Sequence, residues 1–149
     1  MMSNMTDCLF CRIVAGSETA AVVYEDERSV AFLDIRPLFP GHVLLAPRAH
    51  IATLPELPAS EVGGLFANAQ TLCVAVETAM RAAGTFVAIN NRVSQSVPHL
   101  HVHIVPRRPK DGLRGFFWPR GKYRDREEME MVRDSLRNEI IRLKTSPLS

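Results

Sequence analysis

The chain has 149 residues, of which 46% are hydrophobic and 23% are charged. This length corresponds to about one domain, and the composition is typical of a soluble globular protein. Intrinsically disordered, collagen-like and low-complexity classes are therefore excluded, and the chain is long enough to bury a core without disulfides.

The net charge of +2 is unevenly distributed along the sequence. The segment from Arg107 to Arg126 contains eight Lys or Arg and two Asp, so it carries +6. The rest of the chain has 10 basic and 14 acidic residues and carries −4. A concentrated basic segment can bind phosphate groups or nucleic acid, but it is equally typical of a solvated loop.

The N-terminal sequence predicts a cytoplasmic protein. Residues 1–15 contain no apolar run behind a basic start, which a signal peptide requires. No stretch approaches the ~20 apolar residues that cross a bilayer, so we expect no membrane partner. Cysteines in such a compartment are not expected to form a structural disulfide.

The first half of the chain predicts three strands and a long helix. Short β-prone runs predict a hairpin over residues 22–33 and a third strand at 43–46. The helix extends from about Ser60 to Ala83 on apolar residues spaced three and four apart. Ser60 is a suitable N-cap, and Gly84 stands where a left-handed C-terminal residue is expected.

The second half of the chain predicts two strands and a second helix. The strands are expected at 86–89 and 100–105, with a polar loop between them. The helix begins near Asp125, which with Glu128 fits a capping pattern. Its weaker apolar face consists of Met129, Val132, Leu136, Ile140 and Leu143. About five strands and two helices predict an antiparallel α+β domain.

Three of the five histidines alternate along the last predicted strand, at His99, His101 and His103. Alternate side chains of a strand point to the same face, so these imidazoles share one face. The outer two are ~13 Å apart at ~3.3 Å per residue, which is too far for one metal ion. The alternative to a functional site is a polar, half-exposed strand face.

Adjacent imidazoles suit attack on an anionic centre such as phosphorus. A neutral imidazole is a nucleophile near neutral pH, and a neighbouring imidazole can donate a proton or stabilise negative charge. The preceding polar loop offers neutral hydrogen-bonding groups for phosphate oxygens, from Asn90, Asn91, Gln95 and Ser96.

The sequence over residues 99–105 resembles the motif of the histidine triad (HIT) family, and residues 95–97 resemble its usual lead-in. Residues 40–44 are similar to the upstream strand of that family, and residues 31–35 to its ribose-binding region. Residues 8–13 resemble the start of its bacterial, adenosine-phosphoramidase-like (HINT-like) branch. The resemblance implies a single HIT domain over residues 1–149, with a core at about 8–107 and a basic arm and C-terminal helix at 108–144.

The resemblance also implies nucleotidyl hydrolase or transferase chemistry through a covalent intermediate. His101 would be the nucleophile on the α-phosphorus, with His103 and His42 completing the histidine set. Ser96 would hydrogen-bond the leaving group, and Gln95 would bind a phosphate oxygen.

Nucleotide binding is implied for a second group of residues. Asp34 would accept hydrogen bonds from the ribose hydroxyls. Phe10, Phe32 and Ile35 would line the base pocket, although core packing is an alternative role for all three. Asn90 would bind phosphate or ribose.

The chain departs from the family pattern in the phosphate loop. Ser94 stands where the family usually has Gly before the Gln, and the loop from Asn90 to Gln95 is about two residues shorter than usual. Glycine adopts a positive φ readily and serine does not, so Ser94 restricts the backbone conformations that this loop adopts without strain.

Cys8 and Cys11 form a C-x-x-C sequence, which in a reducing compartment indicates a metal or redox site. A tetrahedral structural zinc needs two further ligands. The branch that this chain resembles combines two Cys with two His, which implies one structural zinc per chain held by Cys8, Cys11, His50 and His99. The alternative is a pair of reduced, buried thiols.

We therefore expect a hydrolase for nucleoside 5'-phosphoramidates or related purine nucleotide conjugates. The alternatives are a dinucleoside polyphosphate hydrolase or phosphorylase and a non-catalytic nucleotide-binding interaction module. The family resemblance implies a homodimer. The helix from Ser60 to Ala83 is the expected interface element, although its apolar stripe equally fits packing on its own sheet. The basic arm is expected to act near the nucleotide site, through Trp118 or Arg107, or to pack at the dimer interface, rather than to bind nucleic acid.

Overall fold

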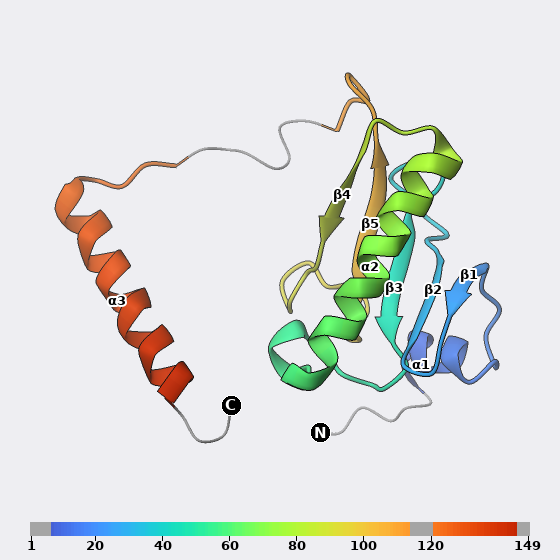
Figure 1. The fold of residues 1–149 in the computed structure, drawn as a ribbon, viewed down its shortest axis with the longest axis horizontal. Coiled ribbons are helices and arrows are strands. Elements are labelled where there is room, and N and C mark those ends of the chain that lie inside the picture. Colours follow the sequence, from blue (N-terminus) through green and yellow to red (C-terminus); the bar gives the residue numbers. More distant parts are fainter. Residues whose placement is uncertain (1–6, 114–120, 146–149) are drawn as a thin grey trace. The chain divides into compact units, whose positions relative to one another are not determined.

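The computed structural model describes residues 7–113 and 121–145, and the chain divides into two compact units, residues 1–111 and 112–149. The first unit is built on a five-stranded sheet with strand order β1-β2-β3-β5-β4, in which every neighbouring pair is antiparallel (Figure 1). The strands are β1 (Val22–Glu25), β2 (Ser29–Leu33), β3 (Val43–Pro47), β4 (Gly84–Ala88) and β5 (Val102–Arg107). The predicted antiparallel α+β fold is thus confirmed.

Helices cover the two faces of this sheet. The long helix α2 (Ala59–Met80) packs on one face of the sheet. It lies there against Val102 and Ile104 of β5 and against Leu100, which precedes β5. The short helix α1 (Leu9–Val14) packs on the other face, where Phe10 meets Phe32 of β2. Because alternate residues point to opposite faces, the three histidines of the motif are directed toward the α1 side.

The ends of α2 differ from the prediction. The helix comes after the single 3-10 turn η2 (Leu54–Glu56) and begins at Ala59, with Pro58 at the N-cap position. Ser60, the predicted N-cap, is therefore inside the first turn of the helix. Its last residue is Met80, and the C-cap Arg81 has the left-handed φ, of 51°, that the prediction placed at Gly84. Gly84 is instead the first residue of β4, because the chain reverses within three residues and pairs at once with Arg107. The prediction that Gly84 terminates the helix is therefore wrong.

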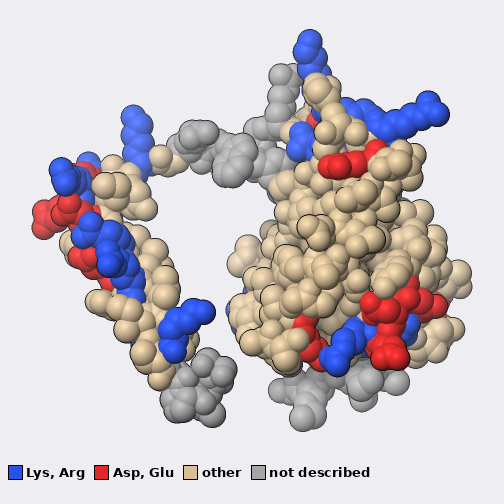
Figure 2. Space-filling view, in the orientation of Figure 1, with Lys and Arg blue, Asp and Glu red and all other residues tan. Residues whose placement is uncertain are grey.

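The solvent-facing side of α2 carries few charges. Its only charged residues are Glu61 and Glu77, and Val74 is 61% exposed. The face of the first unit seen in Figure 2, which includes α2, is accordingly made mostly of uncharged residues. An uncharged exposed face of this kind is typical of surfaces that bind another protein chain.

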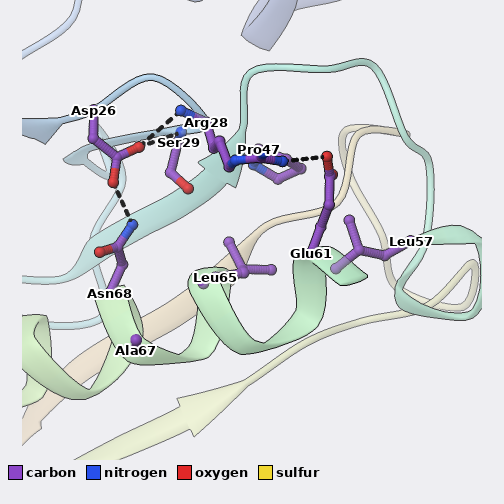
Figure 3. Close-up of a pocket in the computed structure, with 10 residues that line it drawn as sticks. Asp26, Arg28, Ser29, Pro47, Leu57, Glu61, Leu65, Ala67 and Asn68 are labelled. Carbon is purple, nitrogen blue, oxygen red and sulfur yellow. Dashed lines mark hydrogen bonds and ion pairs between the residues drawn. The ribbon is translucent and has the colours of Figure 1, made fainter. Parts of the chain in front are cut away.

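The hairpin β1–β2 is held to α2 by one carboxylate. Asp26 accepts hydrogen bonds from the backbone N–H groups of Arg28 and Ser29 and from the Asn68 side chain of α2 (Figure 3). These bonds favour the charged form and lower the pKa of Asp26 to about 2. Arg28 also pairs with Glu61 across the same hollow of about 210 Å³. The polar groups of this hollow therefore pair with one another, and two of these pairs, Asp26–Asn68 and Arg28–Glu61, join the hairpin to α2.

The second unit contains α3 (Arg126–Thr145). The Asp125 carboxylate accepts a hydrogen bond from the backbone N–H of Glu128 at 2.8 Å, which confirms the predicted cap. None of its residues is buried. Among the helices of the described residues, none combines the length and the apolar character needed to cross a bilayer.

Candidate active site and metal centre

A cleft of about 450 Å³ opens on the α1 side of the sheet. Its walls are largely apolar and come from α1, β2, β3 and the loop before the motif, and His101 and His103 are among its polar lining residues. This size and lining are those of a small-molecule site. Of the predicted site residues, seven line the cleft: Phe10, Phe32, Asp34, Ile35, Ser96, His101 and His103.

Two predicted phosphate ligands lie elsewhere. Gln95 does not line the cleft, because its Nε2 donates to the Ala52 carbonyl at 2.6 Å and its Oε1 accepts from the backbone N–H of Arg92 at 2.9 Å. Asn90 is exposed and lies outside the cleft lining. In this structure Gln95 shapes the loop before the motif, and neither side chain reaches the histidines.

His42 is connected to the cleft through His103. The backbone N–H of Leu38 donates to Nδ1 of His42 at 3.1 Å, so this nitrogen is unprotonated in the neutral ring. The proton therefore lies on Nε2, which is 3.0 Å from Nδ1 of His103 and donates to it. His103 must then carry its own proton on Nε2. The relay leaves His103 with one N–H donor directed away from His42.

His101 has the complementary tautomer. Its Nδ1 is 2.7 Å from the carbonyl oxygen of His99, which only accepts hydrogen bonds, so Nδ1 is protonated. In the neutral ring the lone pair then lies on Nε2. The rings of His101 and His103 have centroids 4.8 Å apart, and Phe10 packs edge-on against His101 at 4.9 Å. A fixed imidazole with a free lone pair thus lies beside a fixed N–H donor.

Burial keeps these rings neutral. Desolvation lowers the pKa of His42 and of His101, and it lowers the pKa of His103 to about 4. The charge of Asp34 opposes this effect for all three but does not reverse it. At neutral pH the site therefore offers an uncharged imidazole nucleophile and an uncharged donor.

Two unusual backbone positions hold the loops around the site. Ser94 has a φ of 60°, in the left-handed region where the family usually places Gly. Gly41 has a φ of 96° and immediately precedes His42. A Cβ at Gly41 would lie 2.6 Å from Cγ of Met80, so both conformation and space require glycine there.

Behind the histidine relay lies a second cluster, made of Cys8, Cys11, His50 and His99. Cys8 caps α1, and its Sγ accepts from the backbone N–H of Cys11 at 3.5 Å, which brings both sulfur atoms to the same side. The Nε2 of His99 donates to the Pro47 carbonyl at 2.8 Å, so its Nδ1 lone pair faces the cysteines. One ligand atom from each residue lies within 4.8 Å of all the others.

The spacing of these atoms fits a tetrahedral zinc site. Zn–S bonds of about 2.3 Å and Zn–N bonds of about 2.0–2.1 Å place tetrahedral S and N ligands about 3.6 Å apart. Nδ1 of His99 is 3.5 Å from Sγ of Cys8 and 3.6 Å from Sγ of Cys11, and Nδ1 of His50 is 3.2 Å from Sγ of Cys11. Burial and the neighbouring Cys8 raise the pKa of Cys11 to about 11, so bringing the Cys11 thiol to the thiolate form at neutral pH needs a cation.

A second set, Asp34, His42 and His103, also has ligand atoms within 4.8 Å of one another. Both nitrogens of His42 are already engaged, one by the Leu38 N–H and the other by His103. Hydrogen bonding therefore accounts for this set. As the strand spacing predicts, His99 and His103 belong to different clusters.

Residues 15–110 match the family profile of the HIT domain. The chain belongs to the HIT domain family. This family consists of nucleotide hydrolases and transferases. A Zn-bound histidine triad family protein from Mycobacterium smegmatis has a structure similar to this HIT protein, with a TM-score of 0.70 and 35% identity over 91% of this chain and 96% of that chain.

Several curated relatives carry names that state an activity, and two of them are an adenylylsulfatase and a tetraphosphatase. Adenylylsulfatase HINT3 from Arabidopsis thaliana is 34% identical over 72% of this chain and 55% of its own length. The asymmetrical bis(5'-nucleosyl)-tetraphosphatase of Schizosaccharomyces pombe is 35% identical over 68% of this chain and 56% of its own length. This chain thus spans about half the length of each of these two relatives.

Some site features had no recognisable signal in the sequence. Leu38 and Pro47 act through backbone groups, which any residue could supply. The basic arm is only partly described: Trp118 lies outside the described residues, and Arg107 pairs with Asp111 at 2.6 Å. Arg107 is not among the residues that line the cleft.

Proposed function

We propose that this HIT protein cleaves nucleoside 5'-phosphoramidates, or related conjugates of a nucleoside monophosphate, at the α-phosphorus. The observation that carries the proposal is the pair of complementary tautomers of His101 and His103, which both line the cleft. His101 has a lone pair on Nε2 because its Nδ1 donates to the His99 carbonyl, and His103 has an N–H donor on Nε2 because its Nδ1 accepts from His42.

The reaction proceeds in two displacement steps. Nε2 of His101 attacks the α-phosphorus, an N–P bond forms, and the P–N bond to the leaving amine breaks. The amine leaves with the bonding electron pair and takes one proton from solvent, which the Ser96 hydroxyl accepts and passes on. Water then attacks the same phosphorus, the bond to His101 breaks with its electron pair returning to Nε2, and the proton given up by the attacking water returns to solvent. The products are a nucleoside monophosphate and the free amine.

The rest of the cleft supports nucleotide binding. Asp34 uses Oδ1 to accept from the Arg36 N–H at 2.9 Å, and its carboxylate has further lone pairs for a ribose hydroxyl. Phe10, Phe32 and Ile35 all line the cleft; the two phenylalanines are buried, whereas Ile35 is 88% exposed. An apolar slot binds purine bases with little discrimination. The N–H of His103 would stabilise the charge on the phosphoryl oxygens.

A dinucleoside polyphosphate is the second candidate substrate, which the similarity to the fission yeast tetraphosphatase favours. The same displacement at the α-phosphorus would then expel a nucleotide through a P–O bond. The chemistry on His101 is unchanged, so only the leaving group distinguishes the two activities.

One experiment separates these functions. Purified protein is incubated with adenosine 5'-phosphoramidate or with diadenosine tetraphosphate, and AMP release is followed by chromatography. We expect turnover of the phosphoramidate, abolished in His101→Ala and retained in Val93→Ala, which is 81% exposed. Preferred turnover of the tetraphosphate would support the second candidate. Binding of AMP without turnover of either compound would refute an enzyme and support a nucleotide-binding module.

We also propose that Cys8, Cys11, His50 and His99 hold one structural zinc ion per chain. The bound ion would supply four bonds that fix the start of α1 to the segment before β5. Because the His99 backbone carbonyl accepts from His101, this anchoring would position the nucleophile. Elemental analysis of protein purified without chelator should give one zinc per chain, lost in Cys11→Ser. Metal-free protein with both thiols freely titratable would refute the site.

A homodimer in the cytoplasm completes the proposal. β4 is at the edge of the sheet, and within residues 7–113 its outer side pairs with no other strand. Val87 of β4 and Val74 of α2 are 43% and 61% exposed, and the face of the first unit seen in Figure 2 is largely uncharged. Sedimentation should give twice the chain mass of 16.6 kDa, and Val87→Glu should shift the equilibrium toward the monomer. A monomeric parent protein would refute it.

A further inference from the structure

The helix α3 has an apolar stripe that no described residue of its own unit covers. Met129, Val132, Leu136, Ile140 and Leu143 are spaced three, four, four and three residues apart, and their exposed fractions lie between 39% and 60%. At about 100° per residue they fall within an arc of about 80°. The spacing repeats after eleven residues, which keeps the stripe straight along a nearly straight helix.

The charges beside this stripe are sorted by sign. Glu128 and Glu139 lie on one flank, about 60–80° from the centre of the stripe, and Arg126, Arg133 and Lys144 lie on the other flank at a similar angle. Both signs are visible along α3 in Figure 2. A solvated helix requires no such separation, because mixed charges keep it equally soluble.

We propose that α3 pairs in parallel with α3 of a second copy of this chain. Glu128 directly precedes the stripe residue Met129, and Glu139 directly precedes Ile140. In a parallel pair, a residue in this position faces the residue five positions later on the partner helix. Glu128 then faces Arg133 of the second copy, and Glu139 faces Lys144 of the second copy. Both contacts occur twice by symmetry, and each brings opposite charges together.

The same charges disfavour the antiparallel arrangement. There, flanks of the same kind face each other, so Glu128 and Glu139 would meet the acidic flank of the second copy and Arg133 would meet its basic flank. In the single chain, Glu128 pairs with Arg124 and Glu139 with Arg142, both at the exposed surface. Exposed pairs of this kind stabilise little, so exchanging them for partners in the pair is inexpensive.

Charge also argues against an anionic membrane as the occupant of the stripe. The side of α3 opposite the stripe carries three acidic residues, Glu127, Glu130 and Asp134, and one basic residue, Arg142, so it lacks the Lys- and Arg-rich polar face of helices that bind anionic lipid surfaces. A second copy offers both a matching apolar stripe and complementary flanks. This pairing concerns α3 alone and does not depend on the proposed catalytic function.

Cysteine cross-linking tests the proposal in the full-length protein. Met129→Cys places a thiol on the stripe near one end of α3, and Met131→Cys places one on the opposite side, at a position that is 63% exposed. Under mild oxidation we expect the Met129→Cys protein to form an intermolecular disulfide at least tenfold faster than the Met131→Cys protein. Mass spectrometry of mixed isotope-labelled and unlabelled protein identifies the bond and separates it from products of the native cysteines.

Orientation is tested by mixing the Met129→Cys protein with a Leu143→Cys protein. Parallel pairing gives 129–129 and 143–143 bonds, whereas antiparallel pairing gives the mixed bond, because the two positions are about 21 Å apart along the helix. Adding Glu128→Lys and Glu139→Lys to Met129→Cys should slow cross-linking, and adding Arg133→Glu and Lys144→Glu as well should restore it. Equal rates for Met129→Cys and Met131→Cys, a mixed bond, or no restoration would each overturn the proposal.

Discussion

Replacing Gly41 with alanine probes the link between the turn before β3 and the histidine relay. Gly41 has a φ of 96°, and an added Cβ would lie 2.6 Å from Cγ and 3.0 Å from Sδ of Met80. An L-residue in a left-handed conformation costs about 1–2 kcal/mol, and moving Met80 off its rotamer costs about 0.5–1.5 kcal/mol. We therefore expect Gly41→Ala to lower the free energy of unfolding by about 1.5–3.5 kcal/mol.

Activity should fall as well, because the next residue is His42. Its Nε2 donates to His103 across 3.0 Å, and a shift of the turn lengthens this bond. A displacement of about 1 Å in catalytic geometry reduces rates by up to about 100-fold. We expect kcat/KM for the phosphoramidate to fall at least tenfold while the protein stays folded.

Urea unfolding of a double-mutant cycle separates the two contributions. Met80→Ala removes the side chain that the new Cβ would touch, so only the backbone cost of Gly41→Ala should remain in that background. The coupling energy should therefore equal the steric part, about 0.5–1.5 kcal/mol. The reasoning is refuted if Gly41→Ala is as stable as the parent protein, or if it costs the same with and without Met80.

Three further outcomes are expected. Ser94→Gly should raise the free energy of unfolding in urea by about 0.5–1 kcal/mol, since Ser94 has a φ of 60°. Because the native pKa of His103 is about 4, the unfolded ring binds a proton first as pH falls below its ordinary value of 6.5. Stability should then fall between about pH 6.5 and 4, and His103→Asn should weaken this dependence in urea titrations; an unchanged slope would contradict it. Removing metal with a strong chelator should lower the thermal midpoint of the parent protein but not of Cys11→Ser.

The local features of this protein are determined by its sequence. Strict alternation directs His99, His101 and His103 to one face whatever the rest of the chain does, because consecutive side chains of an extended segment point in opposite directions. The Asp125 cap of α3 depends only on a side chain and the backbone N–H of the following turn. Predictions of both kinds need no knowledge of distant contacts, and the structure has both features.

Helix ends and loop residues depended on packing. The end of α2 falls at Arg81 because β4 must begin at Gly84 to pair with Arg107, a constraint from a residue much later in the chain. The Gln95 side chain, which the sequence predicts to bind phosphate, donates in this structure to the Ala52 carbonyl, 43 residues earlier in the chain. This bond satisfies a backbone group that the fold would otherwise leave unpaired, and that requirement does not exist in the sequence alone.

The residue types of the site are thus set by sequence, and their chemical states by the tertiary structure. His42 and His103 are 61 positions apart and meet only because β3 and β5 are neighbours in the sheet. Which nitrogen of each ring carries the proton follows from the Leu38 N–H and the His99 carbonyl, which folding brings into place. An imidazole can be donor or acceptor on either nitrogen in isolation, so only its folded surroundings decide which one can attack phosphorus.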